Sequence, residues 1–243
     1  MDAPDRFEHK FLLGIEAASA LRAELGPALQ PDTVGGGGGR YPVVSLYYDS
    51  PDLHCYWEHW RGVPARRKLR VRIYGTSDGT IPSATFLEIK HKSDGRGGKR
   101  RLATTLTEAL RLAAGESPRT PLNPADARVA AEAARLATAE GFRPTAVMRY
   151  ERQAFSLESP DAAPLRITFD EDVRVRLDDL SLRTDDRAFV HPVFAPGSCV
   201  LEVKGERAVP AAFAALLARR RIYPRQISKY AEGLRGRHPA LVG

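Results

Sequence analysis

Basic residues recur at every second position in one short stretch of the sequence, RRKLRVRIYG at residues 66–75. The cationic members of this alternation are Lys68, Arg70 and Arg72. Successive side chains of a β-strand point to opposite faces, so the pattern predicts a strand with one apolar and one wholly cationic face. Solvent-facing strands usually mix polar residue types, whereas a repeated positive charge favours an anionic ligand.

Four further segments divide charged from apolar residues with the same period of two: 6–11, 86–92, 164–170 and 200–206. Their charged faces carry Arg6, Glu8, Lys10, Glu88, Lys90, Lys92, Arg166, Asp170, Glu202, Lys204 and Glu206. If helices cover the apolar faces and the sheet closes into a barrel, these charges point inward. Burying an unpaired ion costs several kcal/mol, so such an interior suits a hydrated polyanion. The carboxylates would pair with basic groups or hold a divalent metal.

The composition is that of one large globular domain of 243 residues. A net charge of +7 and a pI of about 9.6 favour an acidic partner: nucleic acid, phosphate compounds or anionic lipid. The two cysteines, Cys55 and Cys199, are too few for a disulfide framework or a zinc cluster, and we expect a cytoplasmic protein. We find no signal peptide and no membrane span, so membrane association would require a partner.

Periodicity and breaker residues predict an α+β chain with helices outside an antiparallel sheet. Expected helices cover 15–29, 107–115, 125–140, 210–220 and 228–235. Expected strands cover 43–50, 66–74, 84–92, 99–104, 145–156, 164–170, 172–177 and 198–205. The glycines at 35–39 predict a flexible surface loop, and DSPD at 49–52 a turn that caps the aromatic segment 53–60.

The motifs occur in an order that resembles a known family. They are RFEHK, SLYYDS, KLRVRIYG, FLEIKHK, KRR, MRYERQAF, LRITFD, VLEVKGE and QISKYAEG, from about residue 6 to 235. This succession resembles the vacuolar transporter chaperone (VTC) domain of the triphosphate tunnel metalloenzymes, a CYTH-like superfamily. The resemblance implies a closed, eight-stranded antiparallel barrel with outer helices. It also implies a polyphosphate polymerase that adds the γ-phosphate of ATP to a growing chain with Mn²⁺ or Mg²⁺.

The resemblance also assigns roles to individual residues. Phosphate-binding catalytic groups would be Lys10, Arg70, Arg72, Lys90, Lys99, Arg152, Arg166 and Lys229. Lys204 would join Arg70, Arg72, Lys90 and Arg166 in binding the nucleotide, and the metal carboxylates would be Glu202 and Glu88. Phosphoryl transfer depends on charge neutralisation and in-line positioning, and arginine forks bind phosphate bidentately. The terminal phosphate of the chain would be the nucleophile, so no Ser or Cys nucleophile is needed.

Several of these residues have simpler interpretations. Period two places Arg152 opposite Arg149, so either could face the tunnel; motif position favours Arg152. Glu202 could be only a salt-bridge partner, and Glu88, like Glu8, could only balance charge. Of the rest, Lys68 could be structural, Asp170 could orient an arginine, and Lys229 could lie at the surface rather than at the tunnel mouth.

The aromatic segment offers weaker candidates. His54 and His59 are five residues apart, whereas zinc ligands that share a helix face are three or four apart, so both are expected to be structural. Five aromatic residues are expected to pack in the fold, although an adenine could stack near the entrance: Tyr47, Tyr48, Tyr56, Trp57 and Trp60.

Other functions remain open at the level of sequence. A triphosphatase on the same fold usually carries an ExExK signature, but RFEHK has a single Glu, which favours the polymerase. A non-catalytic module that binds polyphosphate or nucleotides would use the same basic residues. RNA binding has little support because an RNP-like motif and interleaved aromatics are missing from the basic strands.

Overall fold

The computed structural model describes residues 6–32, 40–75, 85–93, 96–159, 162–184, 189–206 and 208–241. The chain divides into two compact units, each assembled from three separate segments. Unit 1 comprises Met1–Tyr41, Tyr150–Val173 and Phe194–Ile227, and unit 2 comprises Pro42–Arg149, Arg174–Val193 and Ser228–Gly243. The glycine run at 35–39 lies outside the described residues, and the single-domain interpretation stays a prediction.

Eight strands follow one hydrogen-bonded order, β1-β10-β8-β7-β3-β4-β5-β6. They are β1 (Arg6–Gly14), β10 (Ser198–Glu206), β8 (Ala162–Arg176), β7 (Arg143–Ser159), β3 (Arg40–Asp49), β4 (Arg66–Tyr74), β5 (Thr85–Ser93) and β6 (Arg96–Thr104). The ladders β1–β10, β10–β8, β3–β4, β4–β5 and β5–β6 are all antiparallel. The predicted α+β class with eight antiparallel strands is confirmed. The described residues include no β1–β6 pairing that would close the order.

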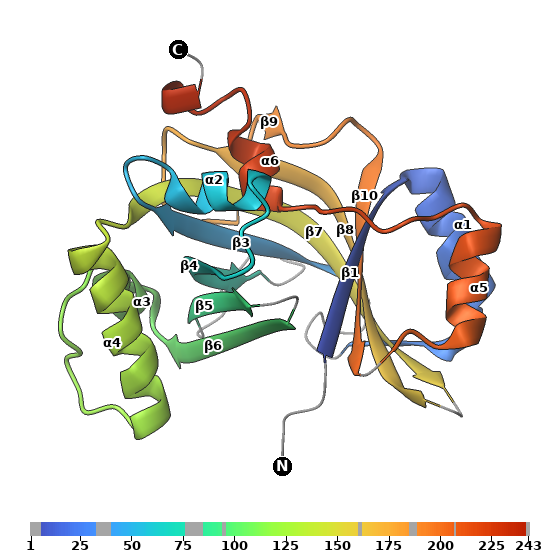
Figure 1. Cartoon of the computed structure of the whole chain (residues 1–243), viewed down its shortest axis with the longest axis horizontal. Coiled ribbons are helices and arrows are strands. Elements are labelled where there is room, and N and C mark those ends of the chain that lie inside the picture. The colour runs from blue at the N-terminus through green and yellow to red at the C-terminus, as the bar shows by residue number, and fades with distance from the viewer. Residues whose placement is uncertain are drawn as a thin grey trace. The chain divides into compact units, whose positions relative to one another are not determined.

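Unit 1 packs helices against the apolar face of β1, β10 and β8. Its helices are α1 (Ile15–Leu25), the 3₁₀ helix η1 (Gly26–Ala28) and α5 (Ala211–Arg219), and the short strand β2 (Leu29–Pro31) pairs with β7. Leu21 of α1 and Leu217 of α5 share one hydrophobic cluster with Phe11 and Leu201. Figure 1 shows α1 and α5 together beside β1 and β10. The charged faces of these strands are thereby turned away from the helices.

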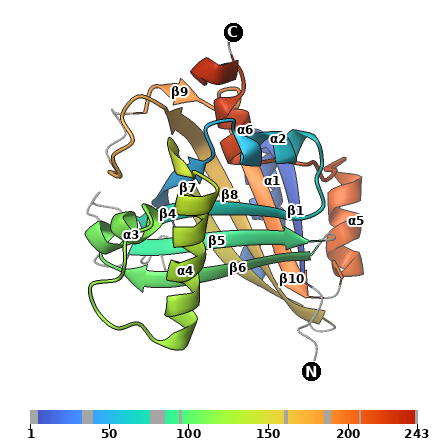
Figure 2. The same ribbon diagram turned by 60° about the vertical axis from the view of Figure 1, so that its left-hand side comes forward.

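Unit 2 uses the same principle for β3 to β6. Its helices are α2 (His54–Trp60), α3 (Leu106–Ala113), α4 (Pro124–Ala139), α6 (Lys229–Leu234) and the 3₁₀ helix η4 (Pro239–Leu241), and β9 (His191–Pro192) pairs with β8. The apolar residues Leu69, Val71 and Ile73 of β4 are completely buried. Figure 2 shows α4 lying across β5 and β6, and α3 packs on β4, β5 and α4. The alternating pattern at 66–74 therefore predicted both the strand and its buried face correctly.

Several boundaries differ from the sequence prediction. The helix expected to end at residue 29 ends at Leu25, because Gly26 adopts the left-handed region with φ 43°. The two strands expected at 164–170 and 172–177 are one strand, β8, in which Asp172 takes φ 47° without ending the strand. The short strands β2 and β9 were not predicted. No helix of the described chain is long and apolar enough to cross a membrane.

The turn before α2 forms the cap that its sequence predicted. The Asp49 carboxylate accepts hydrogen bonds from the backbone N–H groups of Ser50, Cys55 and Tyr56 at 2.8–3.1 Å. It also accepts one from the Tyr230 hydroxyl at 2.6 Å. Asp49 thus ties α2 to α6 within unit 2, and a wholly buried side chain is satisfied by four donors.

Candidate functional site

Basic side chains from β4, β5 and β6 form rows on one face of unit 2. Cross-strand partners project to the same face, so the register of the ladders defines these rows. The first row is Tyr47, Arg70, Glu88 and Arg101, and the second is Lys68, Lys90 and Lys99. Arg72 lies one step further along β4 and donates a hydrogen bond from Nε to Ser45 Oγ at 2.8 Å. We call this set, together with Ser228 at the N-cap of α6 and Tyr230 in its first turn, the unit 2 cluster.

Glu88 lies at the centre of the unit 2 cluster and is completely buried. Its Oε2 accepts hydrogen bonds from Arg70 Nε at 2.8 Å and Nη2 at 2.5 Å, and its Oε1 accepts one from Lys99 Nζ at 3.1 Å. Burial alone would raise the pKa of Glu88, but Arg70, Arg72 and Lys99 hold it well below its usual range. Because cations take both oxygens, this geometry fits a charge-balancing role for Glu88 better than metal binding.

Tyr47 faces the same cations, although its sequence context indicated only packing. Its hydroxyl accepts a hydrogen bond from Arg70 Nη1 at 3.0 Å, and its ring stacks on that of Tyr230 at 5.1 Å between centroids. Burial would raise the pKa of Tyr47, yet the charges of Arg70 and Arg72 lower it to about 7. The signal that could have found it is the period of β3, which puts Ser45 and Tyr47 on one face.

The start of α6 adds two further groups to the unit 2 cluster. Lys68 Nζ donates a hydrogen bond to Ser228 Oγ at 2.8 Å, and Ser228 caps α6 by accepting from the Ala231 N–H at 3.3 Å. Lys68 also lies 5.5 Å from the ring centroid of Tyr230. Lys229 is only 7 % exposed, which excludes its interpretation as a surface residue.

A second set of charges, the unit 1 cluster, alternates in sign across β1, β10 and β8. Its rows are Lys10, Glu202 and Thr168, and Glu8, Lys204 and Arg166. Lys204 Nζ lies 3.3 Å from both Glu8 Oε1 and Glu202 Oε2, and Lys10 Nζ lies 3.9 Å and 3.8 Å from the same two carboxylates. Burial would lower the pKa of Lys204, but Glu202 and Glu8 raise it above its usual value. Two ammonium groups therefore hold two carboxylates close together.

Arg152 of β7 completes the unit 1 cluster. Its Nε and Nη2 donate to the two oxygens of Asp170 at 2.6 Å and 2.7 Å, and Nη2 lies 3.7 Å from Glu202 Oε2. Asp170 thus orients an arginine, as the sequence suggested. Arg149 instead belongs to unit 2, where its Nε donates to the Thr184 carbonyl at 3.2 Å. Arg152, and not Arg149, joins the predicted site residues of unit 1.

Arg166 is the most exposed member of the unit 1 cluster. Half of its side chain (49 %) is accessible, and its Nη2 lies 2.8 Å from Asp32 Oδ2. Asp32 had no assigned role in the sequence. An arginine held by one carboxylate at its edge still presents nitrogens to a phosphate, because the guanidinium carries five donors.

A comparison with protein families finds that the model of the VTC domain matches residues 5–237, which include all the motifs quoted from the sequence. The chain belongs to the VTC domain family. None of the curated proteins compared with the sequence matches it.

Among the solved structures that match the chain, three examples do so at low sequence identity and with TM-scores below 0.5. A candidate adenylate cyclase of Bacillus halodurans is 12% identical (TM-score 0.49), covering 92% of this VTC domain and 95% of that chain. A candidate adenylyl cyclase of Hippeastrum, described as having a dominant triphosphatase activity, is 16% identical (TM-score 0.49), with 94% of each chain covered. The Mimivirus capping enzyme triphosphatase is 8% identical (TM-score 0.36), with 89% of each covered. The activities of these proteins do not transfer to this chain at such values.

The carboxylate oxygens of the unit 1 cluster are suitable ligands for a divalent cation in this VTC domain. Glu8 and Glu202 supply oxygen ligands of the kind that Mg²⁺ and Mn²⁺ prefer. Within the described part of the chain, no group of three or more His, Cys, Asp or Glu could hold a metal alone. Mg²⁺ is commonly held by one or two carboxylates together with substrate phosphates. Thr168, opposite Glu202, is 1 % exposed, and its hydroxyl has no hydrogen-bond partner among the described residues, which suits a bound water or phosphate oxygen.

The two histidines of the aromatic segment lie against side chains of the same segment. His54 Nε2 lies 3.2 Å from Glu58 Oε1, and His59 is buried beside Trp60 at 5.1 Å between ring centroids. Trp57 and Trp60 are about 40% exposed and lie near Arg61 and Arg235, respectively. The structural interpretation of both histidines agrees with these contacts.

Proposed function

We propose that this VTC domain is a phosphotransferase that moves the γ-phosphate of ATP onto a chain of inorganic polyphosphate. The observation that carries the proposal is the unit 2 cluster, in which six cations of β4, β5 and β6 share one face with the buried carboxylate of Glu88. These cations are Lys68, Arg70, Arg72, Lys90, Lys99 and Arg101. Such an excess of fixed positive charge is matched by a ligand with several consecutive phosphates.

The reaction needs no nucleophile from the protein. A terminal oxygen of the polyphosphate chain attacks the γ-phosphorus of ATP, and the bond from that phosphorus to the β–γ bridging oxygen breaks. The electron pair leaves with ADP, and the chain grows by one phosphate. Fixed guanidinium and ammonium groups stabilise the charge on the transferred group without reorganising, which is the main contribution that a protein makes to this chemistry.

Roles follow for the two clusters. We assign phosphate binding to Arg70, Arg72, Lys90, Lys99 and Lys229 in unit 2, and to Lys10, Arg152, Arg166 and Lys204 in unit 1. Glu202, assisted by Glu8, would hold Mg²⁺ or Mn²⁺, whose charge would neutralise phosphate oxygens when bound. Glu88 would instead keep Arg70 and Lys99 oriented. ATP, triphosphate and polyphosphate are the partners that this assignment implies, with a membrane protein as a further partner for recruitment.

A triphosphatase is the second candidate, because water could replace the polyphosphate chain as the nucleophile. A two-metal hydrolase would need a denser set of carboxylates than the unit 1 cluster offers, where two lysines already contact both glutamates. This arrangement supports transfer to phosphate over hydrolysis.

Product analysis with γ-labelled ATP tests the proposal. The purified chain is incubated with Mn²⁺ or Mg²⁺ and a short polyphosphate primer, and the products are resolved on a denaturing gel. We expect a ladder of labelled chains that Arg70→Gln abolishes and that Glu202→Gln loses at a metal concentration just sufficient for the wild type. The matched control is Arg128→Gln, which alters an exposed arginine of α4 outside both clusters.

The other outcomes assign other functions. Labelled phosphate alone, lost in the same variants, would make the protein a triphosphatase. If wild-type protein retains polyphosphate on a filter but produces neither product, the transferase is overturned in favour of a binding module. A ladder that survives in Arg70→Gln would contradict the role of the unit 2 cluster.

A further inference from the structure

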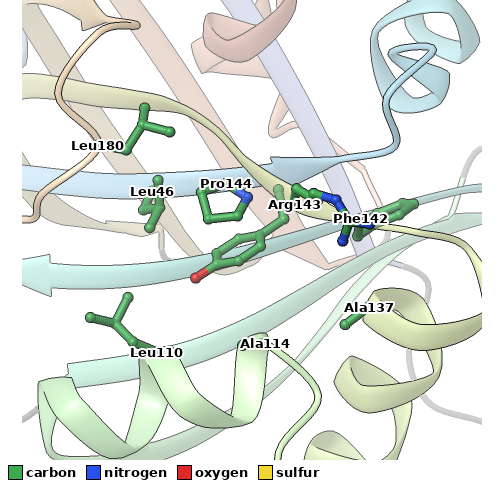
Figure 3. A pocket seen from close by; sticks show the side chains of 9 residues that line it. Leu46, Leu110, Ala114, Ala137, Phe142, Arg143, Pro144 and Leu180 are labelled. Atoms are coloured by element: carbon green, nitrogen blue, oxygen red, sulfur yellow. The ribbon is translucent and has the colours of Figure 1, made fainter.

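Unit 2 contains a concave site on the opposite face of β3 from Tyr47. It is a cavity of about 380 Å³, at the lower end of the roughly 300–1,000 Å³ that small-molecule sites occupy. Figure 3 shows the leucines of its wall and the two helices that border it: α3, with Leu110 and the C-cap residue Ala114, and α4, with Ala137. Successive residues of a strand face opposite ways, so the cavity is separate from the unit 2 cluster.

The wall of this cavity is almost entirely apolar. The apolar lining consists of Leu46, Leu110, Ala114, Ala137, Phe142, Pro144 and Leu180. Leu46 and Phe142 are buried in the fold, whereas Leu110 and Leu180 are only partly buried. An apolar ligand that covers the wall would remove this surface from water, which is the usual driving force for small-molecule binding.

Two polar side chains line the cavity, and neither has a partner within the described part of the chain. Tyr48 is 3 % exposed, yet its hydroxyl makes no hydrogen bond to any described residue. Burial raises the pKa of Tyr48, so the phenol stays protonated and available as a donor. Arg143 is exposed, and its guanidinium forms no ion pair or hydrogen bond with the described residues. Both groups line the cavity wall and can meet a ligand there, the phenol as a hydrogen-bond donor and the guanidinium as a cation.

The positive charge of Arg143 limits the class of ligand that the cavity can bind. One guanidinium can neutralise one carboxylate through its fork of donors, whereas a phosphate with two charges would need more cations than the cavity offers. The apolar wall excludes a strongly hydrated body such as a sugar or a nucleotide. The remaining class is a small monocarboxylate with an aliphatic body.

We propose that this cavity binds a medium-chain fatty acid, with its carboxylate at Arg143 and its chain along the apolar wall beneath Tyr48. The site does not depend on the proposed phosphotransferase activity, because it lies on the other face of β3 and shares no residue with the unit 2 cluster. Tyr48 hydrogen-bonds a polar atom of the ligand or a water molecule that is held with it.

Calorimetric titration of the full chain with decanoate, and with decanol as the uncharged counterpart, tests this site. We expect one saturable event with decanoate and weaker binding of decanol. Arg143→Gln should weaken decanoate binding about tenfold while decanol binding changes by less than about twofold. Tyr48→Phe should weaken decanoate binding by a smaller factor, because only a hydrogen bond to a neutral group is lost. Arg128→Gln is the matched control, since it removes an exposed arginine that is not part of the cavity.

A blocking variant keeps the test independent of charge. Ala114→Leu adds bulk at an exposed position of the cavity wall, where the fold has room to accept it, and should abolish binding with an unchanged circular dichroism spectrum. The proposal is overturned if wild-type protein shows no saturable binding of decanoate, if decanol binds equally well, or if Ala114→Leu binds as the wild type does.

Discussion

Arg70 donates two hydrogen bonds to a single oxygen of the Glu88 carboxylate, from Nε at 2.8 Å and from Nη2 at 2.5 Å. Its remaining nitrogen, Nη1, donates to the Tyr47 hydroxyl. The guanidinium is therefore fixed on two sides, by a carboxylate on β5 and a phenol on β3. A group held in this way loses little conformational freedom when it meets a phosphate, and such preorganisation is the main contribution that a fixed cation makes to phosphoryl transfer.

We expect Glu88→Gln to destabilise the fold. Removing one partner of a buried ion pair leaves the cations uncompensated, which typically costs about 3 kcal/mol or more. The pKa of Glu88 is lower in the folded protein than in the unfolded chain. The carboxylate therefore stabilises the fold fully at pH values above its ordinary pKa, and this stabilisation is lost as the pH falls through the pKa of the folded state. Urea unfolding at neutral pH measures the change. Glu132→Gln is the control, a glutamate paired with His91 and Arg100 outside the cluster.

Polyphosphate should restore part of the stability lost in Glu88→Gln, because its phosphates supply the missing negative charge. The ligand should raise the unfolding midpoint of the variant more than that of the wild type. An equal rise in both proteins would contradict the placement of phosphate beside Arg70 and Lys99.

Tyr47 should titrate near neutral pH in the protein without ligand. Its pKa of about 7 lies below the ordinary value of about 10, so the unfolded chain binds more protons between these limits. Tyr47 therefore stabilises the fold increasingly as the pH rises from about 7 to about 10, and this contribution is lost as the pH falls through 7. The absorbance of phenolate is measured against pH in the wild type and in Tyr47→Phe. The difference between the two curves is the titration of Tyr47 alone, without that of Tyr74, whose pKa is also lowered.

Triphosphate should raise the pKa of Tyr47 back towards its ordinary value. Lys68, Arg70 and Arg72 are the cations that hold the Tyr47 phenolate, and a bound phosphate would compete for them. We expect the midpoint to rise when triphosphate is added, with uptake of a proton on binding. Identical absorbance curves for wild type and Tyr47→Phe below a pH of about 10 would refute the assignment.

The faces of the charged strands could be predicted from sequence because they depend only on a period of two. Lys68, Arg70 and Arg72 share one face of β4, and the apolar residues between them are buried as expected. The sequence did not predict which charged residues of neighbouring strands lie opposite each other, because that depends on the register of the ladder. A shift of one residue in the β4–β5 ladder would have put Glu88 opposite an apolar side chain.

Uncharged members of the clusters were missed for a different reason. The period of two puts Ser45 and Tyr47 on one face of β3, but neither residue carries a charge that would mark this face as part of the basic set. Thr168 was read only as part of an alternating strand. The sequence predicted a break in the strand between residues 170 and 172, but the pairing of β8 with β10 and β9 continues on either side of it.

The bidentate pair of Arg152 and Asp170 predicts strong coupling in a double-mutant cycle. Asp170→Asn should destabilise the fold by about 3 kcal/mol, because it leaves a buried guanidinium short of a counter-charge. Arg152→Met combined with Asp170→Leu should recover most of that loss, since a buried ion pair replaced by apolar residues is often nearly neutral. Unfolding free energies of the four proteins measure the coupling. Additive effects would show that the two residues act independently.

Glu202→Gln distinguishes a metal ligand from a salt-bridge partner. As a metal ligand, Glu202 should set the concentration of Mg²⁺ or Mn²⁺ that half-saturates activity, and we expect the variant to raise it about tenfold or more. Metal-free binding of polyphosphate should not weaken, because the variant removes a negative charge beside Lys10 and Lys204. Glu171→Gln is the matched control, a buried glutamate of the same unit that pairs with Arg22 and Arg40. An unchanged metal requirement in Glu202→Gln, with tighter binding of polyphosphate, would leave Glu202 as a salt-bridge partner alone.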